Sequence, residues 1–143
     1  MTLVVATGTF DLLHPGHVFY LERSRALGDE LVVIVARGIN VRHKPKPILP
    51  DEQRLRMIAA LKVVDRAILG EESDIFRTVE TLRPDIITLG YDQHFDEDAL
   101  REELFRRNLN CKIVRIMDHE PCSLCSSSRI VAKVLERFRG RRF

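Results

Sequence analysis

Residues 3–28 read LVVATGTFDLLHPGHVFYLERSRALG, and the fold class can be inferred from their pattern. The segment begins with the apolar residues 3–6, a run typical of a strand that is buried on both faces. A polar loop follows. A helical pattern then starts at Pro15, which suits the first turn of a helix, and stops at Gly28, a residue type favoured just beyond a helix end. The segment predicts a strand, a loop and a helix in succession.

The same alternation continues along the chain. Four more strands are predicted from apolar runs, at residues 31–36, 66–69, 85–89 and 112–117. Four more helices are predicted from amphipathic segments, at residues 51–63, 74–82 and 96–108 and from the serine cluster 126–128 onward. Strands that alternate with helices join through right-handed crossovers into a parallel sheet. We therefore predict an α/β fold class: a Rossmann-like, doubly wound, five-stranded parallel sheet in a single domain over residues 1–143.

Composition and charge narrow the possible partners. The 143 residues are 45% hydrophobic and 31% charged, which suits one soluble domain with a real core. A formal net charge of +2 is too small to attract nucleic acid or an anionic membrane in bulk. The charge is uneven, because residues 129–143 carry +5 and the rest of the chain −3. This basic end could bind phosphate, complement the last helix dipole as a solvated end, or bind nucleic acid; we favour the solvated helix end.

The lengths of the apolar runs and the number of cysteines indicate in which cellular compartment the protein is found. The longest apolar run, residues 31–36, is far below the roughly 20 residues of a membrane span, and no charged-then-apolar leader opens the chain. Three cysteines are too few for a disulfide scaffold, so we expect reduced thiols and a cytoplasmic protein. Cys122 and Cys125 could instead join His119 and Cys111 in a zinc site, or form a redox-sensitive pair, or be inert small residues.

Ligands of such sheets bind beyond the carboxyl ends of the strands, which selects the loops 7–17, 37–50, 90–95 and 118–128. In the first loop, His14 and His17 flank a helix start whose free amides favour an anion, and Gly16 lets a phosphate approach the backbone. Two imidazoles three residues apart can donate to one phosphate. Asp11 could tie down the loop or hold a magnesium ion. The alternative is that His14 caps a turn and His17 lies on the surface.

Residues 8–17, GTFDLLHPGH, resemble the signature of the nucleotidyltransferases of the cytidylyltransferase-like superfamily. That signature is Gly-Thr-Phe-Asp followed by His-x-Gly-His, and the match has no gap. The resemblance implies that His14 and His17 are catalytic. It also implies nucleotide-binding roles for a wider set of residues in this loop, namely Thr9, Phe10, Asp11, His14, Gly16 and His17.

Residues 44–54, KPKPILPDEQR, resemble the lysine-containing loop of the same superfamily and the helix with Glu-x-x-Arg-like character that follows it. The resemblance implies that Lys44 or Lys46 contacts the phosphates as a catalytic residue. The alternative is a solvated basic loop. Arg54 is a weaker candidate, because an arginine on a helix usually lies on a solvated face.

Two later loops extend the resemblance. Residues 90–95, GYDQHF, look like the Gly-Asp-Asp-type turn beside the nucleotide base, which implies that Tyr91 and Asp92 bind base or ribose groups; a plain polar loop is the other interpretation, above all for His94. Residues 122–130, CSLCSSSRI, take the place of the Ile-Ser-Thr or Ser-Ser-Thr motif. Phosphate-binding roles are thereby implied for Ser126, Ser127, Ser128 and Arg129. Simple capping of the last helix is the alternative for the serines.

The approach to this last motif contains cysteine and lacks the Arg and Gly of the glycerol-3-phosphate cytidylyltransferases. With Pro15 and a short basic final helix, the chain looks more like the archaeal FAD synthetases, which are FMN adenylyltransferases. That resemblance implies ATP and FMN as substrates, Mg²⁺ or another divalent cation, and a homodimer with neither a nucleic-acid nor a membrane partner. The alternatives are a cytidylyltransferase that makes CDP-glycerol from CTP and glycerol 3-phosphate, and a non-catalytic nucleotide sensor. The intact histidine pair disfavours the sensor.

Overall fold

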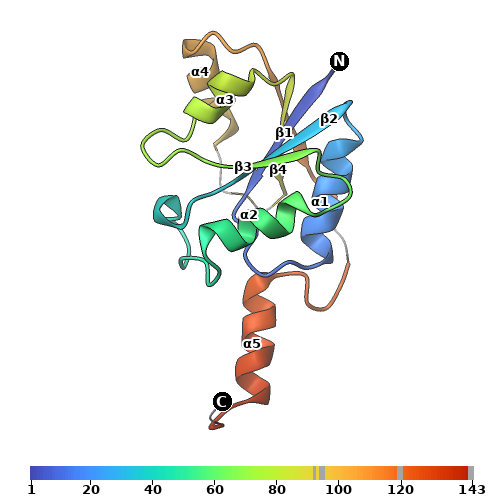
Figure 1. Cartoon of the computed structure of the whole chain (residues 1–143), viewed down its shortest axis with the longest axis vertical. Coiled ribbons are helices and arrows are strands. Elements are labelled where there is room, and N and C mark those ends of the chain that lie inside the picture. The colour runs from blue at the N-terminus through green and yellow to red at the C-terminus, as the bar shows by residue number, and fades with distance from the viewer. Residues whose placement is uncertain (92, 94–95, 119–120, 142–143) are drawn as a thin grey trace.

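The predicted alternation of strands and helices is present in the computed structural model, which describes residues 1–91, 93, 96–118 and 121–141 (Figure 1). The strands are β1 (Leu3–Gly8), β2 (Glu30–Val35), β3 (Arg66–Leu69), β4 (Ile86–Gly90) and β5 (Lys112–Ile116). The α-helices are α1 (Pro15–Arg25), α2 (Asp51–Ala59), α3 (Arg77–Leu82), α4 (Glu97–Arg106) and α5 (Ser127–Arg137). A short 3-10 turn, η1 (Gly38–Asn40), follows β2.

The five strands form one sheet in the order β3-β2-β1-β4-β5, with every neighbouring pair parallel. Central β1 pairs Val5 with Val32 of β2 on one side and with Ile87 of β4 on the other. The predicted fold class is therefore confirmed. The strand order reverses between β1 and β4, and crevices at such a reversal are where open α/β sheets bind ligands.

Four helices cover the two faces of the sheet. Leu21 of α1 and Ile58 of α2 are fully buried against one face. Val79 of α3 and Leu104 of α4 pack against the other face. Because both faces are covered, residues 4–6 of β1 and 31–35 of β2 are all buried Val, Ile, Leu or Ala.

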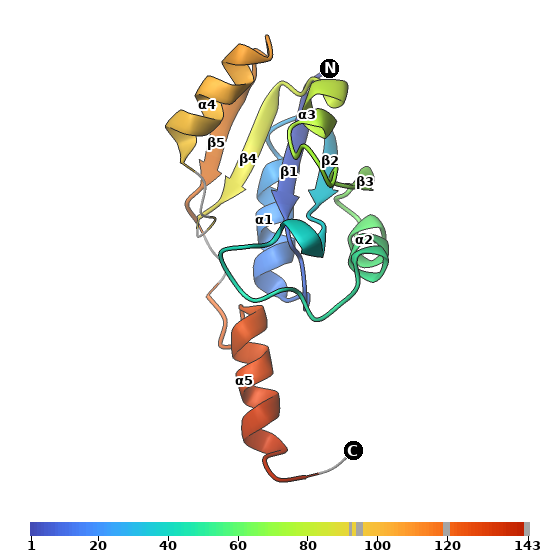
Figure 2. The ribbon, with the colours of Figure 1, turned by 90° about the vertical axis from the view of Figure 1, so that its left-hand side faces the viewer.

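The last helix departs from the doubly wound expectation. α5 extends away from the carboxyl-end edge of the sheet, along the long axis of the molecule, and covers neither face (Figures 1 and 2). None of its residues is buried, and the stripe of Ile130 and Val134 remains partly or largely exposed. α1 to α4 already cover both faces, and the first turn of α5 is tied to the β1–α1 loop through Ser127.

Two helix boundaries differ from prediction for local reasons. The second predicted helix ends at Ala59 instead of residue 63. In the next turns the hydrogen bonds span three residues instead of four, such as Leu61 N–H to Ile58 C=O at 3.1 Å. The third starts at Arg77 instead of residue 74, because the Asp74 carboxylate accepts the Phe76 N–H and forms a turn. Within the described ranges, no helix is both long and apolar enough to cross a membrane.

Candidate active site

The loop between β1 and α1 is held in an unusual shape by a buried ring. Phe10 has φ +53°, a left-handed conformation that is uncommon outside glycine, and its side chain is only 3% exposed. A Cβ on Gly8 would lie 2.6 Å from that ring, so the close approach requires glycine. The ring contacts His17 edge-on, with centroids 5.5 Å apart, and stacks on Tyr20. The buried Phe10 ring thus packs beneath the loop, against His17 and Tyr20 of α1.

His14 is the N-cap residue of α1. Its Nδ1 accepts the Gly16 N–H at 3.1 Å, which satisfies one free amide of the helix start. An imidazole that accepts a hydrogen bond at Nδ1 carries its proton on Nε2. A Cβ on Gly16 would lie 2.9 Å from the His14 ring, so glycine is needed for this close fit. The cap places the His14 imidazole at the positive end of a helix.

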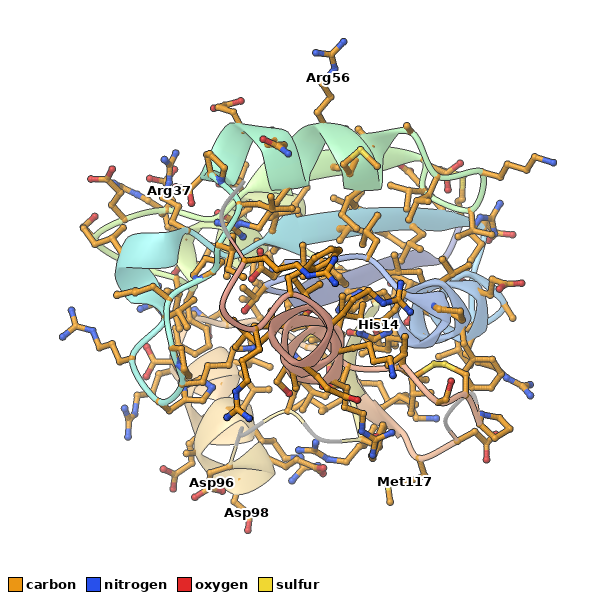
Figure 3. The ribbon with its side chains drawn as sticks, turned by 90° about the horizontal axis from the view of Figure 1, so that it is seen from below. His14, Arg37, Arg56, Asp96, Asp98 and Met117 are labelled. Atoms are coloured by element: carbon orange, nitrogen blue, oxygen red, sulfur yellow. A yellow bond between two sulfur atoms is a disulfide. The ribbon has the colours of Figure 1, made fainter. Side chains whose placement is uncertain are left out.

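His14 and His17 lie against each other, with ring centroids 3.8 Å apart and planes 26° from parallel. Burial is the largest cause that lowers the pKa of His17 to about 3, and the electrostatic effects of His14 and Lys44 contribute to the same shift. His17 is therefore neutral at pH 7 and can donate one hydrogen bond. In the described part of the chain its buried Nδ1 has no hydrogen-bond partner. In the view along α5, His14 projects between α5 and α1 (Figure 3).

The structure separates the two lysines of the 37–50 loop. Lys44 lies close enough to His17 for its charge to act on that ring. Lys46 instead donates from Nζ to the carbonyl oxygens of Gly38 and Ile39, at 2.8 and 3.0 Å. The ammonium of Lys46 therefore stabilises the η1 turn, while the charge of Lys44 acts on His17.

Two side chains join the 37–50 loop to the histidine loop. The Asp11 carboxylate accepts the N–H groups of Ile48 and Leu49, at 2.9 and 3.0 Å. Arg54 is fully buried, and its guanidinium donates to backbone oxygens of both loops. Its acceptors are Thr9 O and Ala36 O at 2.7 Å, Leu49 O at 3.0 Å and the Asp51 carboxylate.

The expectation of a solvated Arg54 is wrong. α2 begins directly beside the ends of β1 and β2, so the inner side of its first turn faces backbone carbonyls instead of water. A buried guanidinium needs that many acceptors to offset the cost of leaving water. The signal available in the sequence was the arginine three residues after Asp51, behind Pro50 at the start of a helix.

α5 brings a second helix N-terminus to the same loop. Ser127 Oγ accepts the Leu12 N–H at 3.2 Å and donates to the Leu12 C=O at 3.1 Å. Ser126 is the N-cap residue: its Oγ accepts the Arg129 N–H and lies 2.7 Å from Ser128 Oγ. The serines therefore do cap and tether the helix, and they leave its first amides beside the 8–14 loop.

At the end of β4, a glutamine that the sequence analysis missed links two strands. Gln93 Oε1 accepts the Gly90 N–H at 2.6 Å, and its Nε2 donates to Thr7 O at 3.1 Å. Arg115, also missed, donates to Gly90 O and Gln93 O. Tyr91 beside them is 49% exposed. Of the other predicted residues here, Asp92 and His94 lie outside the described residues.

Tyr20 of α1 forms hydrogen bonds to residues near the carboxyl ends of β1 and β4. Its hydroxyl is buried, donates to Thr88 O at 2.9 Å and accepts from Thr88 Oγ1. The Thr7 N–H also donates to it. Burial raises the pKa of Tyr20 to about 12, although both threonines oppose the rise, so the hydroxyl stays protonated. It joins α1 to the carboxyl ends of β1 and β4.

The cysteines test two expectations, that of reduced thiols and that of a zinc site. Cys122 and Cys125 form a disulfide, with their Cα atoms 5.4 Å apart. The chain turns just before α5, so these two residues, three positions apart in the sequence, come into contact. The expectation of reduced thiols is therefore wrong for this pair. Cys111 is a free thiol, and burial raises its pKa. Across the described ranges, no group of three or more His, Cys, Asp or Glu side chains could hold a metal ion. His119, the fourth residue of the zinc alternative, lies outside those ranges.

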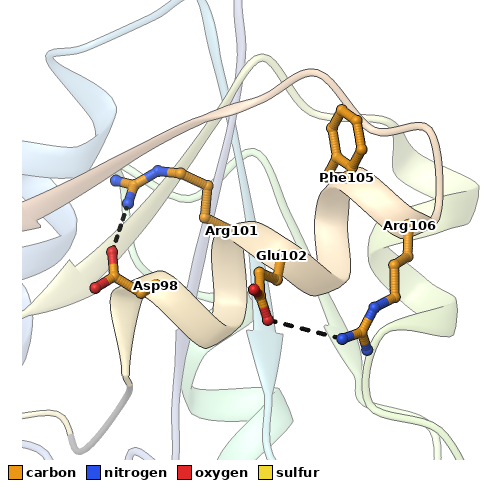
Figure 4. A pocket seen from close by; sticks show the side chains of 5 residues that line it. All are labelled: Asp98, Arg101, Glu102, Phe105 and Arg106. Atoms are coloured by element: carbon orange, nitrogen blue, oxygen red, sulfur yellow. Dashed lines mark hydrogen bonds and ion pairs between the residues drawn. The ribbon is translucent and has the colours of Figure 1, made fainter.

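A separate hollow lies on the outer side of α4 (Figure 4). Its lining contains none of the predicted site residues and includes Phe105, which is 81% exposed. Charged side chains surround that ring, and ion pairs join Asp98 to Arg101 and Glu102 to Arg106. The hollow is open to solvent and lies on a different part of the molecule from the histidine pair.

Comparisons with known proteins identify the family. The model of the cytidylyltransferase-like family matches residues 5–133. The chain is 65% identical over 136 residues to the FAD synthase of Methanothrix thermoacetophila, covering 95% of each chain. It is 60% identical over 137 residues to the FAD synthase of Archaeoglobus fulgidus, covering 96% of this chain and 100% of the relative.

Solved structures agree. The crystal structure of the lipopolysaccharide core biosynthesis protein from Thermoplasma volcanium matches with a TM-score of 0.80 and 52% identity, over 84% of this chain and 99% of the other. The pantoate-beta-alanine ligase from Francisella tularensis matches with a TM-score of 0.61 over 92% of this chain and 65% of the other; at 16% identity this likeness shows the fold alone. By its sequence and its fold, the chain belongs to the cytidylyltransferase-like family of nucleotidyltransferases, with curated relatives that are named FAD synthase.

Proposed function

We propose that this chain transfers the AMP moiety of ATP to FMN, giving FAD and pyrophosphate, at the site around His14 and His17. The near full-length relatives named FAD synthase support the reaction. The observation that carries the location is the stacked histidine pair at the N-terminus of α1, 3.8 Å between centroids. Donors and a helix dipole converge there on the position that an anion would occupy.

The chemistry is an in-line displacement. An oxygen of the FMN phosphate attacks the α-phosphorus of ATP, a new P–O bond forms, and the bond from the α-phosphorus to the bridging oxygen breaks to release pyrophosphate. FMN is already an anionic nucleophile at neutral pH, so no covalent enzyme intermediate is needed. Catalysis then consists of positioning and of stabilising charge on the α-phosphate and the leaving group.

The residues divide these tasks. His14, through Nε2–H, and neutral His17 donate to the α-phosphate. Lys44 supplies the nearby positive charge. Lys46 stabilises the loop through Gly38 and Ile39. The other proposed nucleotide-binding residues are the loop residues Thr9, Phe10, Asp11 and Gly16, the base-side residues Tyr91 and Asp92, and Ser126, Ser127, Ser128 and Arg129 at α5.

A divalent cation such as Mg²⁺ is proposed to enter with the triphosphate. Mg²⁺ commonly binds substrate phosphates together with few protein groups. Both oxygens of Asp11 already accept backbone amides, so the described residues do not build a metal site around it, and no step above is routed through a metal.

Assembly and location complete the proposal. A homodimer is supported by the exposed apolar side chains of α5, among them Val134 at 47% and Leu135 at 66% exposure. A cytoplasmic location is consistent with the lack, among the described residues, of a helix that could span a membrane.

One assay separates the alternatives. Purified protein with magnesium is given either ATP plus FMN or CTP plus glycerol 3-phosphate, and pyrophosphate is measured. We expect pyrophosphate with ATP and FMN, together with a fall in flavin fluorescence because adenine stacks on the isoalloxazine ring. Turnover only with CTP and glycerol 3-phosphate would show a cytidylyltransferase. Nucleotide binding without any pyrophosphate would show a sensor.

A further inference from the structure

Two groups that the proposed function assigns to the reaction, His17 and Lys44, come from different segments of the chain. His17 lies in the first turn of α1, and Lys44 lies in the long connection between β2 and α2. The sheet hydrogen bonds between β1 and β2 end at Gly8 and Val35, before either loop begins. Some other contact must therefore set the position of Lys44 relative to His17.

Arg54 makes that contact. One guanidinium nitrogen, Nη1, donates both to Thr9 O in the histidine loop and to Ala36 O beyond β2, each at 2.7 Å. Nε of the same group donates to Leu49 O in the lysine loop at 3.0 Å. A planar guanidinium has its donors in a rigid fork, so it fixes the three carbonyl groups relative to one another.

Asp11 makes a second link in the opposite direction. It belongs to the histidine loop, and its two carboxylate oxygens accept Ile48 N–H and Leu49 N–H in the lysine loop. Leu49 is thus held through both its N–H and its C=O, by side chains from two different segments. The lysine loop is pinned to the histidine loop shortly after Lys44.

We propose that Arg54 and Asp11 are positioning residues of the transfer reaction: they hold the lysine loop against the histidine loop so that the Lys44 ammonium stays beside His17. The proposal rests on the proposed function for the catalytic assignment of Lys44 and His17. Neither positioning residue touches the reacting atoms. Arg54 is fully buried, and both Asp11 oxygens are used by the backbone.

The expected effect is kinetic. Misplacing a catalytic group by about 1 Å can cost on the order of 100-fold in rate. Arg54→Lys keeps the charge but loses the fork, and Asp11→Asn keeps only one acceptor oxygen. We expect each variant to lower kcat by about 10-fold to 100-fold. A matched control is Arg56→Lys, because Arg56 projects into solvent from the same helix (Figure 3).

The decisive measurement is a double-mutant cycle with Lys44→Met. If Arg54 and Asp11 act by positioning Lys44, substituting them should hardly change kcat in a protein that already lacks the Lys44 ammonium. We expect Arg54→Lys and Asp11→Asn to lower kcat by less than about 3-fold in the Lys44→Met background. If Arg54→Lys and Asp11→Asn lower kcat by the same factor in the wild-type and Lys44→Met proteins, the proposal is overturned and these residues have a structural role only.

A second readout does not depend on FAD formation. Titration of the His17 ring by NMR reports the proximity of the Lys44 charge, because that charge lowers the pKa of His17. Loosening the loop through Arg54→Lys or Asp11→Asn is expected to raise this pKa, and Arg56→Lys is expected to leave it unchanged. An unchanged pKa in both test variants, each folded by circular dichroism, would contradict the proposal.

The outcomes are separable from those of the proposed function. If Arg54→Lys does not fold, Asp11→Asn carries both tests, since it removes a single hydrogen bond at a half-buried position. If wild-type protein makes no FAD while the His17 titration responds as expected, the proposed reaction fails, and what stands is that Arg54 and Asp11 hold the lysine loop near His17. If wild-type protein makes FAD and the cycle is multiplicative, only the positioning role fails.

Discussion

His14 and His17 lie ring against ring, 3.8 Å between centroids, at the first turn of α1. His14 is held by its hydrogen bond to the Gly16 amide, and His17 is held by burial against Phe10. Both rings are therefore fixed before a ligand arrives. Donors that are positioned in advance stabilise developing charge without reorganising during the reaction.

Replacing His17 should abolish turnover while the fold remains. For His17→Ala we expect kcat to fall by about 100-fold to 10,000-fold, because a positioned donor at the α-phosphate is lost. Pyrophosphate release from ATP and FMN measures the effect, and circular dichroism checks the fold. Glu22→Ala, on the exposed side of the same helix, serves as the control. Near-normal pyrophosphate release from His17→Ala would refute the assignment of the site.

The two lysines should differ. Lys44→Met removes the charge beside His17, and we expect kcat to fall by about 100-fold. Lys46→Met removes two hydrogen bonds to backbone carbonyls of η1, and we expect a smaller loss of about 10-fold or less. Steady-state kinetics of the two variants, with matched side-chain shapes, measure the difference. A larger loss for Lys46→Met would reverse the assignment.

Acid should destabilise the fold partly through His17. Its pKa is about 3 in the folded protein and near the usual 6.5 when the chain is unfolded. Between these values the unfolded chain binds a proton that the folded chain does not, so stability falls as the pH drops from about 6.5 towards 3. Urea unfolding at about pH 7 and about pH 4.5 should show a smaller loss for His17→Gln than for wild type. Equal losses would contradict a neutral, buried His17.

The tether of α5 should matter for ATP binding. Ser127→Ala removes both hydrogen bonds between Ser127 Oγ and the Leu12 backbone. We expect KM for ATP to rise several-fold and amide hydrogen exchange in α5 to accelerate, since an 11-residue helix is marginal without tertiary contacts. Exposed Ser123→Ala is the matched control. Unchanged exchange in α5 would show that this tether does not hold the helix.

Prediction from sequence succeeded where the deciding forces are local. The apolar runs specify buried strands whatever their neighbours are, and the stop at Gly28 and the cap at Ser126 act within a few residues. The start of α1 at Pro15 was likewise predictable, because helix capping by His14 and the closeness of Gly16 are short-range effects; the catalytic roles of the histidines stay a prediction.

Other features depended on contacts between distant segments. Arg54 looked like a solvated helix residue, yet its acceptors come from three segments that only the sheet brings together. The choice between Lys44 and Lys46 required the path of their loop, and the roles of Gln93 and Tyr20 required the neighbouring ends of β1 and β4. No local pattern encodes such distances.

The amino-acid sequence alone thus determined the α/β fold class, the strand and helix segments and the histidine loop, since burial periodicity and capping are properties of short segments. The tertiary structure decided that α5 projects from the sheet, that Cys122 and Cys125 are joined, and that His17 is neutral. It also decided that the charge of Lys44 acts on His17 while Lys46 holds the η1 turn. The physical reason is that burial, electrostatic coupling and buried hydrogen bonds depend on which remote groups the folded chain brings within a few ångströms of each other.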